Sequence, residues 1–182
     1  MPAEPAARNR APGAPPRIYL SAPLFTQAQR QWNRRLAAAL AEALSGATVL
    51  LPQDFRVEDR YNDPRTFASI YRQCTEAIAG ADALVAVFDG PDADSGTAFE
   101  VGFAAARGVP VIGVRTDYRP GQDRGANLML SRACARFVFS MSFHEDTDAL
   151  AAEVARKLRA VLEAGKKPPK GDQPQKSPDE SR

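Results

Sequence analysis

The stretch from Ala83 to Phe88 is apolar at every position and stands between two aspartates, Asp82 and Asp89. A strand with one solvated face alternates between apolar and polar residues, whereas a strand buried on both faces reads as a continuous apolar run. The stretch therefore predicts a buried strand of a parallel sheet, and the rest of the chain must supply its neighbours.

Strand-like and helix-like segments alternate along the chain. The other strand-like runs are 17–23, 47–52, 109–116 and 136–141. Apolar residues at helical spacing mark 26–46, 65–81, the segment that ends at Arg107, 128–133 and 146–164. This alternation predicts an α/β fold in which helices cover both faces of a five-stranded parallel sheet. Ligands of such sheets bind beyond the carboxyl ends of the strands, so we expect the chemistry in the loops 21–26, 52–63, 89–97 and 115–127.

Length and composition indicate one domain with two tails. The chain has 182 residues, and one globular domain is predicted at 17–164. The flanks 1–16 and 165–182 are rich in proline, lack periodicity and are predicted to be disordered.

Charge and residue usage limit the possible partners. A net charge of +2 argues against nucleic acid or a membrane as partner, and no apolar run reaches the roughly 18 residues of a transmembrane helix. The N-terminus lacks an apolar signal region, and Cys74 and Cys134 show no pairing pattern, so we expect a cytoplasmic protein with reduced thiols. His144, the single histidine, is expected in a surface turn. With only one histidine the chain cannot form a His-rich metal site, and neither a metal ion nor a cofactor is expected.

Glu100 stands among small and apolar residues, in a segment that follows an acidic loop. Thr97 to Glu100 fits a capping box, in which the carboxylate only reaches back to the start of a helix. Alternatively, Asp94 or Ser95 caps the helix, which moves Glu100 into its apolar part. A carboxylate there is costly to bury without partners, so the second interpretation favours a paired or functional Glu100.

The neighbours of Glu100 also favour a ligand. Gly96 and Gly102 remove side chains on either side of it, so a ligand can approach closely. Two other motifs fail here. A calcium loop that starts at Asp92 needs a glutamate at its twelfth position, where Phe103 stands. The Gly-Lys-Ser/Thr sequence of a phosphate-binding P-loop is missing.

Five segments in this order resemble the nucleoside 2-deoxyribosyltransferase family. They read IYLSAPLF, ADALVAVFDG, DSGTAFEVGFA, GVPVIGVRTD and, at 127–129, NLM, and the resemblance extends over nearly all of 17–140. It implies a flavodoxin-like three-layer sandwich, in agreement with the strand count. It also implies transfer of 2-deoxyribose between nucleobases, with nucleosides and nucleobases as small-molecule partners.

The resemblance implies roles for three side chains. Glu100 becomes the nucleophile that attacks C1′ of the sugar and forms a covalent glycosyl-enzyme, as in retaining glycosidases. Tyr19 becomes its hydrogen-bond donor, although a tyrosine in a strand can equally be a packing residue. Asp94 becomes part of the sugar and base site, although it can also be a helix cap. A carboxylate at this position would repel a phosphate, which favours a substrate with a free 5′-hydroxyl.

Asn127 is matched to a family asparagine that reaches the active site of a neighbouring subunit. This implies a homo-oligomer, a dimer or a hexamer, with shared active sites. An asparagine before a helical segment is also a typical N-cap, and both roles are compatible.

Other candidates line the predicted base pocket. In the loop that begins at Pro52, Phe55 offers a stacking surface and Asp54 a possible proton source. Phe25 and Trp32 follow the first strand and are expected in the pocket wall or the core. Asp89, at the end of the apolar run, is expected to shape the loop that follows.

Cys74 is a departure from the family, which usually has an aspartate at this position, eight residues before Asp82. That aspartate contacts the base and can protonate it, and a thiol is a weak donor that cannot replace it. Alternatively, Cys74 packs as a small buried residue and the contact to the base has moved.

Three functions therefore stay open. Besides the transferase, the chain is compatible with an N-glycosidase that acts on nucleosides or nucleoside 5′-monophosphates, and with a nucleotide-binding sensor that has lost turnover. Phosphoribohydrolases with a Gly-Gly-x-Gly-Thr-x-x-Glu element rank lower, because Pro91 to Ala93 lacks the preceding glycine pair. A preference for purines or pyrimidines is not predicted.

Overall fold

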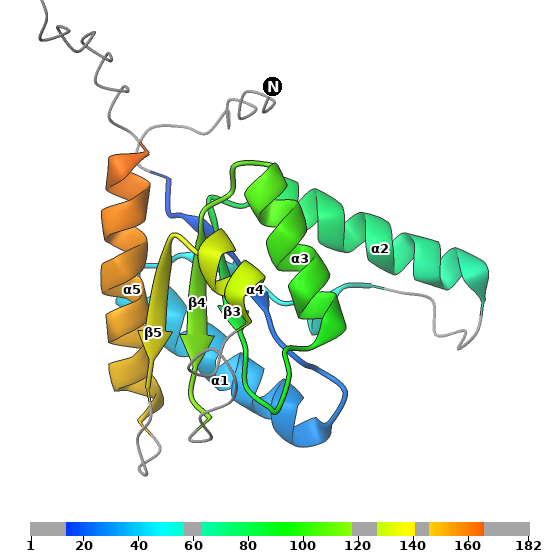
Figure 1. The fold of residues 1–182 in the computed structure, drawn as a ribbon, viewed down its shortest axis with the longest axis horizontal. Helices are drawn as coiled ribbons and strands as arrows, with labels where there is room; N and C mark the ends of the chain where they lie inside the picture. Colours follow the sequence, from blue (N-terminus) through cyan, green and yellow to red (C-terminus); the bar gives the residue numbers. More distant parts are fainter. Residues whose placement is uncertain (1–13, 57–62, 118–126, 141–145, 166–182) are drawn as a thin grey trace, which may run out of the picture.

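The computed structural model describes residues 14–56, 63–117, 127–140 and 146–165, and the following statements concern these residues. Five parallel strands form one sheet in the order β2-β1-β3-β4-β5 (Figure 1). The strands are β1 (Arg17–Ser21), β2 (Thr48–Leu50), β3 (Ala83–Val87), β4 (Val111–Arg115) and β5 (Arg136–Phe139). This is the flavodoxin-like strand order, so the predicted fold class is confirmed.

The helices fall close to the predicted segments. They are α1 (Gln27–Ala43), α2 (Pro64–Ala79), α3 (Ser95–Ala106), α4 (Leu128–Ala133) and α5 (Thr147–Ala164). A short 3-10 helix, η1 (Pro52–Asp54), was not predicted and lies in a segment expected to be loop. Among the described residues, no helix combines the length and the apolar character needed to cross a bilayer.

Some predictions fall outside the described residues. They concern His144, parts of the loops 52–63 and 115–127, and most of the two tails. The tail boundaries at 16 and 165 stay predictions.

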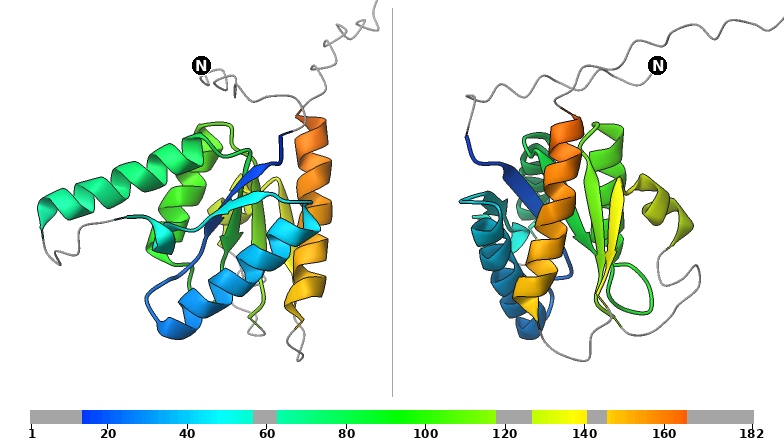
Figure 2. Two further views of the ribbon diagram at one scale, coloured as in Figure 1. Left: turned by 180° about the vertical axis from the view of Figure 1, so that it is seen from behind. Right: turned by 90° about the vertical axis from the view of Figure 1, so that its left-hand side faces the viewer.

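Two layers of helices cover the sheet, one on each face (Figure 2). On one face, α1 and α5 lie side by side over a core that includes Ile18 and Leu20 of β1. On the other face lie α2, α3 and α4, and their core includes Tyr19 of the same strand. Because successive side chains of a strand point to opposite faces, β1 sends Tyr19 and Ser21 toward α3.

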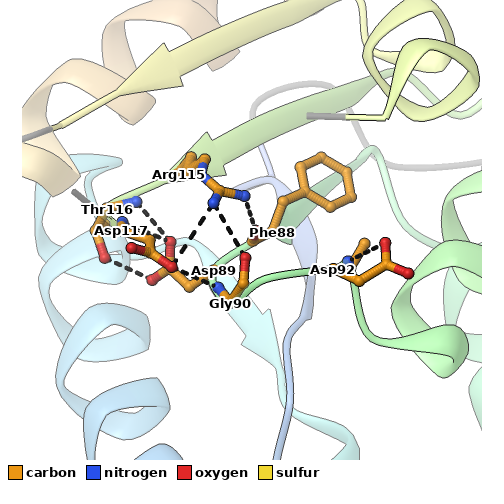
Figure 3. A network of polar contacts seen from close by, with 8 residues as sticks. Phe88, Asp89, Gly90, Asp92, Arg115, Thr116 and Asp117 are labelled. Carbon is orange, nitrogen blue, oxygen red and sulfur yellow. Dashed lines mark hydrogen bonds and ion pairs between the residues drawn. The ribbon is translucent and has the colours of Figure 1, made fainter. Parts of the chain in front are cut away.

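A buried arginine fastens the turn after β3 to the end of β4 (Figure 3). Arg115 is 5% exposed, and its side chain donates to the carbonyls of Phe88, at 2.7 Å, and Gly90, at 3.0 Å. The N–H of Gly90 in turn donates to Asp117 Oδ2 at 3.0 Å. Gly90 has a φ of +111°, which favours glycine at this position.

Asp89 completes this connection from the other side (Figure 3). Its Oδ1 accepts hydrogen bonds from the N–H groups of Thr116, at 2.6 Å, and Asp117, at 3.0 Å, and its Oδ2 accepts from the Thr116 hydroxyl at 2.5 Å. The expectation that Asp89 shapes the loop is therefore confirmed. The loop carries Asp94 and the start of α3, so its anchoring holds the origin of that helix in place.

Candidate active site

Asp94 is the N-cap of α3, and this decides where Glu100 lies on the helix. Its Oδ2 accepts a hydrogen bond from the N–H of Thr97 at 2.9 Å. The helix therefore begins at Ser95, Thr97 lies inside the first turn and Glu100 lies in the second turn. The capping-box interpretation of Thr97 and Glu100 is wrong, because an earlier residue already caps the helix.

Two hydroxyl groups from β1 hold the Glu100 carboxylate. The Tyr19 hydroxyl donates to Oε1 at 2.6 Å, and the Ser21 hydroxyl donates to Oε2 at 2.5 Å. Tyr19 and Ser21 are two positions apart on one strand, so their side chains leave the same face. The predicted hydrogen bond from Tyr19 is confirmed. Ser21 was not predicted, although its spacing from Tyr19 along a strand is the signal that would have revealed it.

The surroundings of Glu100 shift the pKa of its carboxyl group. Desolvation raises its pKa, and the negative charge of Asp94 raises it further. Hydrogen bonds from Ser21, Tyr19 and Cys74 oppose this effect without cancelling it. The pKa of Tyr19 is raised far above its ordinary value by burial and by the Glu100 charge, so its hydroxyl stays a proton donor. The site thus holds a poorly solvated carboxylate whose charge is stabilised by a few fixed donors.

Cys74 lies beside these groups, on α2. Its half-buried thiol interacts with both Tyr19 and Glu100, and burial raises its pKa, so it is a neutral thiol at physiological pH. The structure therefore brings this departure from the family pattern next to the predicted nucleophile. Its effect on the base stays a prediction.

The segment after β2 contributes an aromatic side chain. Phe55 is half-buried, and its ring centroid lies 6.5 Å from that of Tyr19. Asp54 instead pairs with Arg34 at 2.9 Å, with about half of each side chain exposed. Among the described contacts, Asp54 makes none with Glu100, and its role as a proton source stays a prediction.

A buried amide joins the two segments that flank the site. Asn33 is 3% exposed, and its Nδ2 donates to the Pro23 carbonyl at 3.0 Å and to Gln53 Oε1 at 3.1 Å. Gln53 Nε2 then donates to the Arg30 carbonyl at 2.9 Å. The loop after β1 and the η1 segment are therefore fixed relative to each other.

The remaining candidates lie around the site or away from it. Phe25 follows β1 and is 73% exposed, whereas Trp32 packs against the core below α1, as expected for a core residue. A Cβ on Gly96 would lie 3.1 Å from Asp94 Oδ2, so a larger residue would press on the cap. Asn127 is exposed and caps α4, with Oδ1 accepting from the N–H of Met129 at 2.9 Å. Within the described part of the chain, no His, Cys, Asp and Glu residues gather into a metal site.

The fold and the site define a flavodoxin-like α/β protein whose candidate site is centred on a half-buried, hydroxyl-bound carboxylate. Residues 18–129 match the model of the nucleoside 2-deoxyribosyltransferase family, and the chain belongs to this family. This confirms the resemblance found in the sequence and the prediction of an enzyme of that family.

Three known proteins are similar to the chain. A nucleoside deoxyribosyltransferase of Limosilactobacillus fermentum is 30% identical over 137 residues, which cover 69% of this chain and 80% of the relative. The crystal structure of a conserved protein from Enterococcus faecalis superposes with a TM-score of 0.62 at 27% identity, covering 79% of this chain and 99% of the other. The fold of a 2-deoxyribosyltransferase from Bacillus psychrosaccharolyticus is also shared, with a TM-score of 0.60 at 24% identity over 78% and 95% of the two chains.

Proposed function

We propose that the protein transfers 2-deoxyribose from one nucleobase to another through a covalent glycosyl-enzyme on Glu100. The observation that carries the proposal is the Glu100 carboxylate itself, which is half-buried, feels the charge of Asp94 and is held by the hydroxyls of Tyr19 and Ser21. A desolvated carboxylate in fixed geometry suits attack on an oxocarbenium-like sugar carbon.

The reaction proceeds in two displacements at C1′ of the sugar. In the first, an oxygen of Glu100 bonds to C1′ while the bond to the base nitrogen breaks, and the base leaves with the electron pair and takes up a proton. In the second, a nitrogen of the incoming base bonds to C1′, loses its proton, and Glu100 leaves as a carboxylate. The two hydroxyl donors stabilise that carboxylate each time it is released.

Asp94 favours nucleosides over nucleotides. The negative charge of Asp94 acts on Glu100 and raises the pKa of the Glu100 carboxyl group. A 5′-phosphate at this end of α3 would meet two carboxylates, so the proposed substrate carries a free 5′-hydroxyl. Phe55, beside the Tyr19 ring, is proposed to stack on the base.

A hydrolase is the second candidate, and Cys74 favours it. The neutral thiol lies beside Glu100 without a carboxylic acid to hold or protonate a base. If the incoming base is poorly held, water takes its place and the enzyme is an N-glycosidase.

Two incubations separate these functions. With deoxyinosine and adenine, the transferase yields deoxyadenosine and hypoxanthine, and chromatography measures both. With deoxyinosine alone, the hydrolase releases hypoxanthine and free deoxyribose continuously. The proposed transferase instead accumulates a protein whose intact mass has increased by one deoxyribosyl group. Exchange without that covalent adduct would contradict the role of Glu100, and absence of both exchange and hydrolysis would favour the sensor.

We further propose that the active site is completed by a second copy of the chain. Large apolar side chains are exposed on the face formed by α2, α3 and α4. They are Phe67, Ile70, Tyr71, Phe99, Leu128 and Met129. The rings of Tyr71 and Phe99 lie 5.8 Å apart across the two helices. An exposed apolar surface of this kind supports an interaction site, and Leu128 and Met129 directly follow Asn127, which supports a place for Asn127 at the proposed contact.

Mixed subunits test this arrangement. Glu100→Ala and Asn127→Ala are each expected to be inactive, because each removes one part of every site. After subunit exchange, a mixed dimer holds one site with both residues intact, so a random mixture recovers about a quarter of the wild-type rate. Mixing Glu100→Ala with Glu100→Gln is the matched control and recovers nothing. If exchange is verified with differently tagged copies and the first mixture stays inactive, Asn127 does not act across subunits.

A further inference from the structure

Ser21 is a fully buried hydroxyl whose hydrogen-bond partner is the predicted nucleophile. It is the last residue of β1, its exposure is 0%, and its Oγ lies 2.5 Å from Glu100 Oε2. A serine in this environment has no packing advantage over alanine, and burying its hydroxyl is tolerated because Glu100 accepts the proton.

The hydrogen bonds of Ser21 and Tyr19 together define the plane of the carboxylate. A carboxyl group held at one oxygen can still turn about its Cγ–Cδ bond, because that torsion is soft. Donors at both oxygens oppose this rotation, and both come from one rigid strand inside the sheet. Each oxygen keeps a second lone pair for another contact.

We propose that Ser21 is a positioning residue that fixes the orientation and the charge state of Glu100 for attack on the sugar. The inference rests on the proposed function of Glu100. Ser21 acts only through that carboxylate, and its own oxygen forms no bond to the substrate.

The electrostatics agree with this geometry. The groups that face Glu100 are Tyr19 and Ser21 from β1, Cys74 from α2, and Asp94 at the start of α3. Burial and Asp94 raise the pKa of Glu100, and Ser21 makes the largest contribution in the opposite direction. Loss of the hydroxyl should therefore raise the pKa of Glu100 further and shrink the fraction of ionised nucleophile at a given pH.

The test compares Ser21→Ala, which removes the donor, with Ser21→Thr and Ser21→Cys, which keep a strong and a weak donor. For Ser21→Ala we expect kcat to fall about 10- to 100-fold with KM nearly unchanged, because the lost contact orients the reacting group rather than the bound substrate. The acid limb of its pH–rate profile should move to higher pH. Ser21→Thr should retain most of the wild-type rate, and Ser21→Cys should lie between. Ser131→Ala is the matched control, because that hydroxyl binds the Leu128 carbonyl instead.

A second measurement does not depend on turnover. In protein labelled with ¹³C at the glutamate carboxyl carbons, the signal that disappears in Glu100→Gln reports the titration of Glu100. We expect this titration to move to higher pH in Ser21→Ala and to stay in place in Ser131→Ala. If the wild type exchanges no bases but the titration moves, the proposed function fails while the pairing of Ser21 with Glu100 stands. If neither the titration nor kcat changes in Ser21→Ala, the inference is wrong. Should that variant not fold, the same two readouts on Ser21→Cys decide.

Discussion

Replacing Glu100 with glutamine is expected to lower the rate of the proposed base exchange by about 10⁴-fold or more and to leave a fold that is at least as stable as the wild type. The loss is expected because glutamine has nearly the same shape but lacks the anionic oxygen that bonds to C1′. Glutamine is preferable to alanine here, since its amide can keep contacts to Tyr19 and Ser21 and leaves no cavity. Single-turnover release of hypoxanthine from deoxyinosine measures the loss.

The gain in stability follows from the raised pKa of Glu100. Between its ordinary pKa and the higher pKa of the folded state, the folded protein binds more protons at this group than the unfolded chain does. Stability contributed by Glu100 is therefore present at low pH and is lost as the pH rises through this window. At neutral pH the ionised carboxylate destabilises the fold, and glutamine removes that effect.

Thermal unfolding of both proteins between about pH 4 and about pH 7 checks this sign. The midpoint of Glu100→Gln should exceed that of the wild type by a margin that grows with pH. A margin that shrinks with pH would mean that the ionised carboxylate stabilises the fold, and rapid base release by the variant would assign the nucleophile to another residue.

Replacing Cys74 with aspartate is expected to accelerate the proposed exchange of ordinary deoxynucleosides by up to about 10²–10⁴-fold, because the new acid can protonate the leaving base. The thiol lies beside Tyr19 and Glu100, so a carboxyl group there enters the site itself. The new carboxyl group would join those of Glu100 and Asp94. Repulsion among the three negative charges keeps one of the groups protonated to higher pH. That proton is the one the leaving base requires.

Cys74→Asn is the matched control, because it has the shape of aspartate but no acidic proton. We expect it to match the wild type or to be slower. The rate of Cys74→Asp should rise most for bases that leave poorly, and the acid limb of its profile should move to higher pH, because Glu100 becomes harder to ionise. Equal rates for the aspartate and asparagine variants over a panel of purine and pyrimidine deoxynucleosides would show that position 74 does not handle the base.

The fold was predictable because its determinants are local. Local patterns identify each element, such as the apolar run from Ala83 to Phe88 for a strand and the helical periodicities for the helices. Because strands and helices alternate along the chain, a parallel sheet follows as the arrangement. Glu100 was recognisable as a candidate site residue for a related reason, because a carboxylate among small apolar residues conflicts with its surroundings.

Apart from the hydrogen bond from Tyr19 to Glu100, which the family resemblance implied, the contacts between distant segments were not predicted. Ser21 follows Tyr19 at the spacing of one strand face, but only the packing of α3 on β1 brings its hydroxyl to Glu100. Arg115 looks like a surface cation at the end of a strand, yet it is buried under the turn after β3. Asp54 has the chemistry of an acid catalyst, but its side chain pairs with Arg34 on α1. In each case the partner lies at least 20 positions away in the sequence.

The place of β1 in the sheet has a consequence for synthesis of the protein. β1 is synthesised before the other strands, but it lies between β2 and β3. Its pairing with β3 can therefore form only after β3 has been synthesised. Tyr19 and Glu100 are 81 positions apart, so a nascent chain that ends before α3 carries both hydroxyl donors but lacks Glu100. Once α3 has emerged, its carboxylate stays in water until the helix docks on β1. The two hydroxyls and the carboxylate of the candidate site therefore meet only after α3 has docked on β1.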